Sequence, residues 1–363
     1  MNKKKEKVLV AMSGGVDSAV AALLLLKSGY DVTGAFMVNF EGQNALGESC
    51  WHGDYQEALR VAAKLDIPLM RLDFTREYRR DVLSYVKKEY ESGGTPNPDV
   101  MCNRLIKFGA WLNKAKEMGF DYLATGHYAA LKKEKGNFIL KQAKDQNKDQ
   151  TYFLHQLNQE QLKHVFFPLG ELIKEKVRKL AKKYELPNAG REESMGICFI
   201  GEVSMKDFLQ KELKVKAHTG KIVLTSGETV GSHIGLPFYT IGQREQLGIN
   251  SEAKKELGNG AVYVLEKRGT SNELVVGQEN NSLLFREKIE VKDMNWITGQ
   301  EPRLPLKCQV RLRHRQELRP CTLSVSSSRR YVINFQIPER AVTPGQFAVF
   351  YSKNICLGGG IIQ

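Results

Sequence analysis

Apolar runs alternate with longer amphipathic segments through the first half of the chain. Four short apolar runs predict buried strands at residues 7–12, 31–38, 68–74 and 121–129. Between and after them, apolar positions three and four apart predict helices at residues 17–30, 54–67, 76–93 and 106–120. Alternating strand–helix units of this length predict a parallel sheet with helices on both faces, and such sheets bind ligands at the carboxyl ends of their strands.

The pattern changes in the second half of the chain. Helical spacing continues through residues 158–167 and 171–186, but from about Thr219 the chain consists of short apolar runs separated by Gly, Ser and Asn turns. The final segment also has an all-β pattern. We therefore predict an α/β domain at residues 1–205, a small, mostly β domain at 206–284 and a C-terminal β domain at 285–363.

The charge balance favours a polyanionic partner. The 363-residue chain has 54 Lys and Arg against 41 Asp and Glu, which gives a formal net charge of +13. Basic surfaces gain most from phosphates, so nucleic acid is the leading candidate. The alternative is a basic protein with no such partner.

The cysteines indicate a reducing compartment. Their thin spacing and the absence of a CxxC pair fit neither a zinc cluster nor a secreted disulfide framework. The first apolar run is too short for an export signal, and no run is long enough to span a membrane. We expect a cytoplasmic protein that makes no membrane contact. The six cysteines are Cys50, Cys102, Cys198, Cys308, Cys321 and Cys356.

A glycine pair separates the first predicted strand from the first helix. Gly14 and Gly15 let backbone N–H groups point into a concavity, and the helix N-terminus adds a positive partial charge. Hydroxyl donors from Ser13 and Ser18 would complete a cradle for a pyrophosphate. The loop is neither a Walker nor a Rossmann motif. A generic strand–turn–helix junction remains the alternative.

Two cysteines lie inside unusual motifs. In "TPNPDVMCNRLIKFG", Cys102 precedes a helix that we expect to begin around Arg104, where the helix dipole and the cations Arg104 and Lys107 would favour a thiolate. In "EESMGICFIGE", Cys198 lies in an apolar segment flanked by Gly196 and Gly201. Either cysteine alone would be read as a small buried hydrophobic residue. The two cysteines together favour a catalytic role.

The string SGGVDS resembles the signature of the PP-loop ATP pyrophosphatase superfamily, whose members cleave ATP between the α and β phosphates and adenylate a substrate oxygen. The resemblance implies that Met37 and Gly126 line the adenine and ribose, with a plain core role as the alternative for Met37. It also implies that Asp17 holds Mg²⁺ near the phosphates. The loop that would hold ATP comprises Ala11, Met12, Ser13, Gly14, Gly15, Val16, Asp17 and Ser18.

Over its whole length the chain resembles the tRNA-specific 2-thiouridylases, the bacterial MnmA family. That family's architecture implies a C-terminal domain resembling a β-barrel. One departure is "ESMGIC", where many members have a different sequence before the Gly; Cys198 is retained. The loop that contains Cys50 is also atypical, and we assign no role to Cys50, Cys308, Cys321 or Cys356. The motifs that support the resemblance are SGGVDS, NPDVMCN, ATGHYA, KDQTYFL, GICFIGE, YTIGQR, RHRQ, TPGQFAVFY and LGGG.

The resemblance implies a sulfurtransferase reaction. The C2 oxygen of the wobble uridine in tRNAs for Lys, Glu and Gln would be adenylated, which makes it a good leaving group. Cys198 would carry a persulfide received from a sulfur-relay protein or a cysteine desulfurase. Cys102 would attack that persulfide, releasing sulfur to the base and leaving a Cys102–Cys198 disulfide. Asp99 would act in acid–base chemistry, and Asn97, Pro98 and Asp99 would frame the flipped uridine.

Further positions resemble the family's tRNA contacts. Independently of the resemblance, Arg311, Arg313 and Arg315 alternate along a predicted strand, so we expect them to project to one side, near Arg319, as a phosphate-binding stripe. A solvated face is the alternative. The positions matching tRNA contacts are His127, Lys148, Asp149, Gln150, Arg313, His314 and Gln346.

Two other functions remain open. A PP-loop ligase could adenylate a carboxylate and form an amide, but the paired cysteines and the basic β segment argue against it. A non-catalytic RNA-binding protein with a vestigial loop is the second alternative. The intact string from Ser13 to Ser18 argues against that one.

Overall fold

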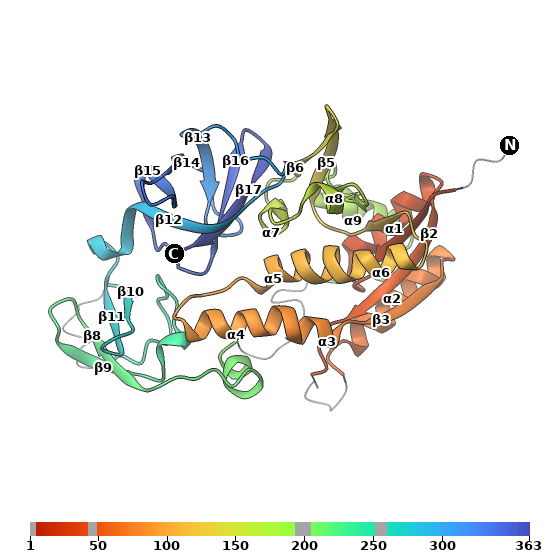
Figure 1. Ribbon diagram of the computed structural model, residues 1–363. Helices are drawn as coiled ribbons and strands as arrows, with labels where there is room; N and C mark the ends of the chain where they lie inside the picture. The colour runs from red at the N-terminus through yellow and green to blue at the C-terminus, as the bar shows by residue number, and fades with distance from the viewer. Residues whose placement is uncertain (1–4, 43–48, 193–204, 251–259) are drawn as a thin grey trace.

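The computed structural model describes residues 5–42, 49–192, 205–250 and 260–363. The chain forms a five-stranded sheet with its helices, a four-stranded sheet and a C-terminal barrel. In Figure 1 the barrel lies above the four-stranded sheet, and the five-stranded sheet lies at the opposite end of two long helices. The predicted fold class of an α/β domain followed by two β domains is confirmed.

The five-stranded sheet is parallel, with the order β3-β2-β1-β4-β7. The fourth predicted strand is shorter than expected: it ends at Ala124 and the chain then leaves the sheet. Part of the segment at 158–167, predicted helical, instead supplies the edge strand β7. The strands are β1 (Lys7–Ala11), β2 (Asp31–Val38), β3 (Leu69–Asp73), β4 (Tyr122–Ala124) and β7 (Val165–Phe166).

Helices α1 and α9 pack against each other beside this sheet, and their buried residues share one core with β1 and β2. Helix α1 is apolar on nearly all sides because it is buried between the sheet and its neighbours. The helices of this layer are α1 (Val16–Lys27), α2 (His52–Leu65) and α9 (Lys174–Lys183).

Two long helices extend from the sheet towards the β domains and contact each other in their middle turns, both of which are wound as π-helix. The first has the predicted position, whereas the second begins at Pro98, earlier than the expected start around Arg104. The first consists of α3 (Thr75–Tyr78), η1 (Arg79–Leu83) and α4 (Ser84–Glu91), and the second of α5 (Pro98–Met101), η2 (Cys102–Trp111) and α6 (Leu112–Glu117).

A hairpin that the sequence pattern did not predict follows β4. Strands β5 (Ala129–Glu134) and β6 (Asn137–Gln142) are joined by Lys135 and Gly136, which both have positive φ, as a tight two-residue turn requires. Strand β6 pairs with β17 of the barrel. The hairpin thereby attaches the α/β domain to the edge of the barrel.

Each of the two β domains has its own core, and a smaller buried cluster joins them. The four-stranded sheet has the order β10-β11-β8-β9. The barrel has the order β12-β15-β14-β13-β16-β17 and is closed by pairing of β12 with β17. The strands are β8 (Gly220–Val223), β9 (Thr229–His233), β10 (Val262–Arg268), β11 (Glu273–Gln278), β12 (Phe285–Trp296), β13 (Leu306–Arg311), β14 (Arg319–Val325), β15 (Tyr331–Arg340), β16 (Phe347–Ser352) and β17 (Ile355–Ile362).

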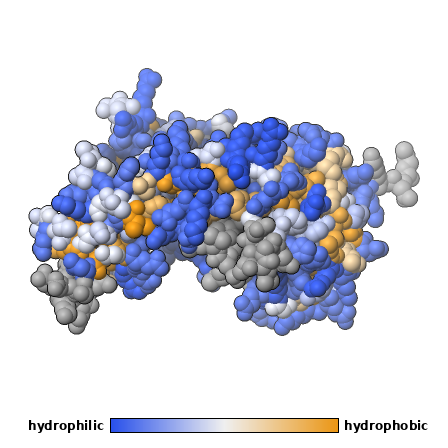
Figure 2. All heavy atoms as spheres, turned by 90° about the horizontal axis from the view of Figure 1, so that it is seen from below, coloured by the Kyte–Doolittle hydropathy of each residue, from blue (hydrophilic) through white to orange (hydrophobic). Residues whose placement is uncertain are grey.

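Short helices connect these parts. They are α7 (Thr151–Leu154), α8 (Gln159–Leu162), α10 (Met205–Asp207), η3 (Phe208–Glu212), η4 (Leu236–Phe238) and η5 (Ser282–Leu284). None of the helices in the described residues is both long enough and apolar enough to cross a membrane. The face seen in Figure 2 is mostly hydrophilic, with hydrophobic residues in small scattered areas.

Candidate active site

The glycine loop lies between β1 and α1, as predicted. Gly14 has φ +75°, and a Cβ at this position would collide with the backbone oxygen of Asp54, so only glycine fits. The Ser18 hydroxyl donates to the Gly15 carbonyl at 2.9 Å and accepts from the Ser13 backbone N–H at 3.2 Å. The serine side chains therefore fix the shape of the loop.

The segment after β4 closes one side of the loop. A Cβ on Gly126 would lie 2.9 Å from the backbone nitrogen of Ser18, so the close approach of this segment to the first turn of α1 requires glycine. Met37, the penultimate residue of β2, is half-buried and packs on the core. That position is compatible with both of its predicted roles.

The Asp17 carboxylate in the first turn of α1 is bound by two side chains that the sequence analysis missed. Lys174 Nζ donates to both of its oxygens, at 2.7 and 2.9 Å, and the Tyr128 hydroxyl donates to one of them at 2.9 Å. Lys174 is the first residue of α9, and its side chain is 13% exposed. No local sequence signal indicated Lys174, because it is 157 positions away from Asp17.

A second cation lies on the other side of the loop. Arg191 and Asn188 both donate to the Gly14 carbonyl, at 3.2 and 2.8 Å. Arg191 also forms an ion pair with Asp54 at the start of α2. These residues too were missed, because the segment that holds them lies far from the loop in sequence.

These groups surround a polar cavity of about 250 Å³. The cavity joins three parts of the chain: the glycine loop, the segment of Lys148 and Gln150, and the barrel residues His314 and Arg315. Seven residues predicted to contact either ATP or tRNA therefore lie around one space: Ser13, Gly15, Val16, Asp17, Lys148, Gln150 and His314. Its lining is Ser13, Gly15, Val16, Asp17, Tyr128, Lys148, Gln150, Lys174, Arg191, Glu192, His314 and Arg315.

Cys102 does not lie at a helix N-terminus, so that expectation was wrong. The helix begins at Pro98, and the Asn97 side chain accepts from the Val100 N–H at 3.3 Å as its N-cap. Cys102 lies one turn inside and is buried. Its neighbour Asn103 donates to the Phe153 carbonyl at 3.3 Å, and the Phe153 ring packs on His314 at 4.5 Å between centroids. The helix that contains Cys102, made of α5, η2 and α6, is called the thiol helix below. It is thus connected to the wall of the cavity.

Two ionisable groups that interact with Lys107 have shifted pKa values. Burial raises the pKa of the Asp99 carboxyl, and the nearby Lys107 opposes that rise. Burial also holds the pKa of His127 well below its usual value, with Lys107 adding to the effect, so His127 is neutral. His127 contacts the Thr125 hydroxyl at 2.7 Å. A carboxyl with a raised pKa can exchange a proton nearer neutral pH, as acid–base chemistry requires.

The expected arginine stripe is absent, and that expectation was wrong. Strand β13 ends at Arg311, and Arg315 has φ +64° in the turn beyond, so the residues do not alternate along one strand. Arg311 is buried and forms a 3.0 Å ion pair with Asp149, which is also buried. The Arg313 guanidinium donates to the Ala341 carbonyl at 2.7 Å.

Two predicted tRNA contacts, Asn97 and Gln346, contact each other. Gln346 in the barrel donates to the backbone carbonyls of Thr95 and Pro96, at 2.8 and 3.2 Å, and Asn97 donates to Gln346 at 3.4 Å. The chain entering the thiol helix is therefore held by the barrel.

Cys198 lies outside the described residues. Cys308 and Cys321 face each other across β13 and β14 with their sulfur atoms 3.6 Å apart. This near pair is not the predicted Cys102–Cys198 pair. Within the described residues, no group of three or more His, Cys, Asp or Glu side chains could hold a metal ion.

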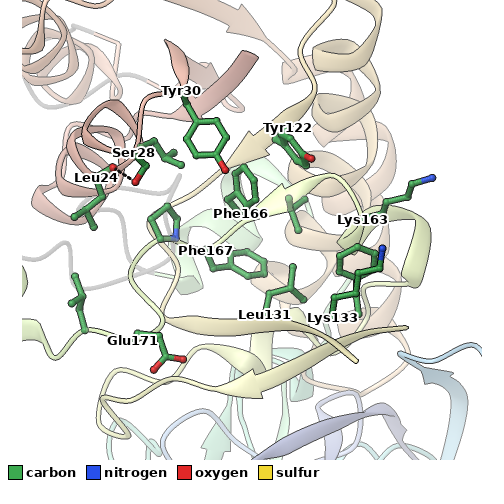
Figure 3. A pocket seen from close by; sticks show the side chains of 15 residues that line it. Leu24, Ser28, Tyr30, Tyr122, Leu131, Lys133, Lys163, Phe166, Phe167 and Glu171 are labelled. Atoms are coloured by element: carbon green, nitrogen blue, oxygen red, sulfur yellow. Dashed lines mark hydrogen bonds between the residues drawn. The ribbon is translucent and has the colours of Figure 1, made fainter. Parts of the chain in front are cut away.

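A larger cavity of about 690 Å³ lies beside the edge strand β7, between the last turns of α1 and the β5–β6 hairpin. Figure 3 shows the rings of Tyr30, Tyr122 and Phe166 gathered in it, with Lys133 and Lys163 to one side. It contains no residue of the glycine loop. Because ligands of such sheets bind at the carboxyl ends of the strands, the smaller cavity is the candidate active site.

Comparison with known proteins covers the whole chain. Three family models match: "tRNA methyl transferase HUP domain" at residues 6–202, "tRNA methyl transferase PRC-barrel domain" at 206–278 and "Aminomethyltransferase beta-barrel domain" at 286–362. The chain is 45% identical to tRNA-specific 2-thiouridylase MnmA of Shouchella clausii, over 99% of this chain and 98% of that protein. It is 44% identical to the protein of the same name from Alkalilimnicola ehrlichii, with the same coverage.

Proposed function

Because the chain belongs to the MnmA family of tRNA-specific 2-thiouridylases, we propose that it uses ATP to replace the C2 oxygen of the wobble uridine with sulfur. The observation that supports this best is the 250 Å³ cavity, which joins the glycine loop to Lys148, Gln150 and His314. A nucleotide held by the loop and an RNA base held by the other segments would meet there. Such an arrangement serves transfer of AMP to a base.

The loop and its cations fit the phosphates of ATP. The backbone at Gly14 and Gly15 starts a twelve-residue helix, whose N-terminus favours an anion. Lys174 and Arg191 add positive charge on two sides. The loop would hold the two phosphates that depart as pyrophosphate and would position the α phosphate for attack by the C2 oxygen. The adenylated oxygen would leave as AMP in the later step.

Mg²⁺ is the proposed metal. Asp17 is an acidic residue of the loop that lines the cavity, and it would hold the ion once the phosphates bind. Carboxylate and phosphate oxygens are the ligands that Mg²⁺ prefers. The carboxylate is bound by Lys174 in this structure, so this role requires Asp17 to exchange partners.

The two motif cysteines are proposed to transfer the sulfur. A sulfur-relay protein or cysteine desulfurase would load a persulfide on Cys198. The tRNAs for Lys, Glu and Gln would be the final acceptors of its sulfur. The Cys102 thiolate would attack Cys198 Sγ, so that the persulfide S–S bond breaks, its terminal sulfur leaves as hydrosulfide and a Cys102–Cys198 disulfide forms. The hydrosulfide would attack C2 as AMP departs. An external thiol would then reduce the disulfide.

Asp99 would serve the base. It lies in the first turn of the helix whose second turn contains Cys102, and burial raises the pKa of its carboxyl. Its proton could be shared with the uridine N3 or the departing oxygen. Asn97 and Pro98 would frame the same base.

The test is AMP release. The protein is incubated with ATP, a persulfide donor and either tRNA or no tRNA, and AMP and 2-thiouridine are measured. We expect AMP release to require tRNA and Cys102→Ser to abolish 2-thiouridine formation. AMP release driven equally well by a small carboxylate, without tRNA, would instead favour an amide-forming ligase.

A further inference from the structure

Lys174 and Asp17 form an ion pair inside the candidate nucleotide site, and their packing is unusual for a structural pair. The Lys174 side chain is 13% exposed and Asp17 is 32% exposed. Both line the 250 Å³ cavity beside Ser13 and Gly15. The ammonium has therefore lost most of its water but faces a space large enough for a phosphate group.

The backbone holds Lys174 in place. Its N–H donates to the Asp145 carboxylate at 2.8 Å, which fixes the first residue of α9 against the segment that leads to Lys148. The centroid of the Tyr128 ring lies 5.8 Å from Nζ. With the backbone anchored, only the flexible side chain has to rotate for Nζ to change partners.

The position of Asp17 explains why the ion pair forms in this structure. Asp17 is in the first turn of α1, where the helix N-terminus and the loop N–H groups favour negative charge. A polyphosphate entering the loop would occupy the same positive region. Its charge would repel the carboxylate and attract the ammonium, so both would favour a change of partner.

We propose that Lys174 is a phosphate-binding residue of the nucleotide site: when the nucleotide binds, its ammonium leaves Asp17 and binds the two phosphates that depart as pyrophosphate. This inference rests on the proposed function. When the bond between the α phosphorus and the bridging oxygen breaks, the electron pair stays on pyrophosphate, and a cation fixed beside that oxygen stabilises the developing charge. Asp17 is at the same time freed to hold Mg²⁺.

The experiment measures equilibrium binding of ATP and AMP to the full-length protein, by calorimetry and without tRNA. Lys174→Gln should weaken ATP binding about 10- to 100-fold, since a hydrogen bond to a charged group contributes roughly that factor. AMP lacks the departing phosphates, so its affinity should change less than about 3-fold. Lys179→Gln is the matched control, because Lys179 lies on the same helix with an exposed side chain; both affinities should be unchanged.

Asp17→Asn tests the exchange of partners. In Mg²⁺-free buffer it should bind ATP at least as tightly as the parent protein, because the competing carboxylate is gone. If Lys174→Gln does not fold, the comparison of Asp17→Asn with Asp17→Asn/Lys174→Gln replaces it, and the same loss of ATP affinity is expected. Equal weakening of ATP and AMP binding, or unchanged ATP binding, would overturn the inference. A parent protein that binds no ATP would overturn the proposed function itself.

Discussion

Two ion pairs of the same chemistry have different surroundings. Asp17 and Lys174 lie beside a cavity and are 32% and 13% exposed. Asp149 and Arg311 join the α/β domain to the barrel and are 0% and 7% exposed. A pair with space beside it can exchange partners with a ligand, whereas an enclosed pair can only hold the parts of the structure together.

The hydrogen bonds around the enclosed pair support that contrast. The Asp149 carboxylate accepts from the Thr151 hydroxyl at 2.8 Å and the Ala143 N–H at 3.1 Å as well as from Arg311. Beside it, the Tyr152 hydroxyl donates to the Leu312 carbonyl at 3.1 Å. This group of residues, which we call the junction, therefore connects the domains through several hydrogen bonds to one buried carboxylate. We expect changes in the junction to affect stability and changes at the loop to affect ligand binding.

The largest stability loss should come from Arg311→Met. It leaves the Asp149 carboxylate buried without its cation, which costs about 3–5 kcal/mol of unfolding free energy. Urea unfolding followed by circular dichroism measures the loss. The double variant Asp149→Asn/Arg311→Met should recover much of it, because no uncompensated charge remains. Stability unchanged in the single variant would contradict the structural role of the pair.

A smaller effect is expected from acid. His155, whose Nδ1 contacts the Tyr152 carbonyl of the junction at 2.6 Å, is fully buried, and burial lowers its pKa to about 4. Its unfolded pKa is about 6.5, so below that value the unfolded chain takes up a proton that the folded protein does not. Stability from neutral His155 is present above pH 6.5 and falls as the pH drops towards 4. Between pH 7 and pH 5 the expected loss is about 2 kcal/mol. If the stability of His155→Gln fell as steeply between pH 7 and pH 5, the assignment of this loss to His155 would be contradicted.

Gln346→Ala should lower the free energy of unfolding by less than Arg311→Met does. It removes the hydrogen bonds to Thr95 and Pro96, and net hydrogen bonds contribute about 1 kcal/mol each. Because these bonds position the segment entering the thiol helix, thiolation should slow while ATP affinity stays at the parent value. Stopped-time assays of 2-thiouridine and ATP calorimetry separate the two effects. Loss of ATP affinity would contradict this prediction, because it would mean that Gln346 acts on the nucleotide site.

The smallest stability effect should be that of Asp17→Asn. Partly exposed ion pairs contribute about 1 kcal/mol or less, so its urea midpoint should lie close to that of the parent. Comparison with Arg311→Met under the same conditions sharpens the contrast between the two pairs. Equal destabilisation by Asp17→Asn and Arg311→Met would contradict the contrast between the two ion pairs.

The sequence predicted what is local. The loop from Ser13 to Ser18 forms its own hydrogen bonds within six residues, so its shape and its place after β1 could be predicted. Long-range features could not. Arg311 was expected on a binding face because alternation along a strand does not show which side faces another domain, and Lys174 is brought to Asp17 only by the fold.

The start of the thiol helix shows a third kind of limit. Asn97 followed by Pro98 is a typical cap and first helical residue, yet we expected the helix to begin only around Arg104. The thiol is therefore buried inside the helix and does not lie at its end. Sequence motifs identified the residue, but its surroundings required the structure.

The most direct test of the central claim is the nucleoside content of tRNA. Mass spectrometry is applied to tRNA from a strain lacking the gene, and from the same strain supplied with the parent protein or with Cys102→Ser. The account predicts that 2-thiouridine is lost from the wobble position on deletion, returns with the parent protein and does not return with Cys102→Ser. Wobble 2-thiouridine that persists in the deletion strain, or is fully restored by the serine variant, would contradict it.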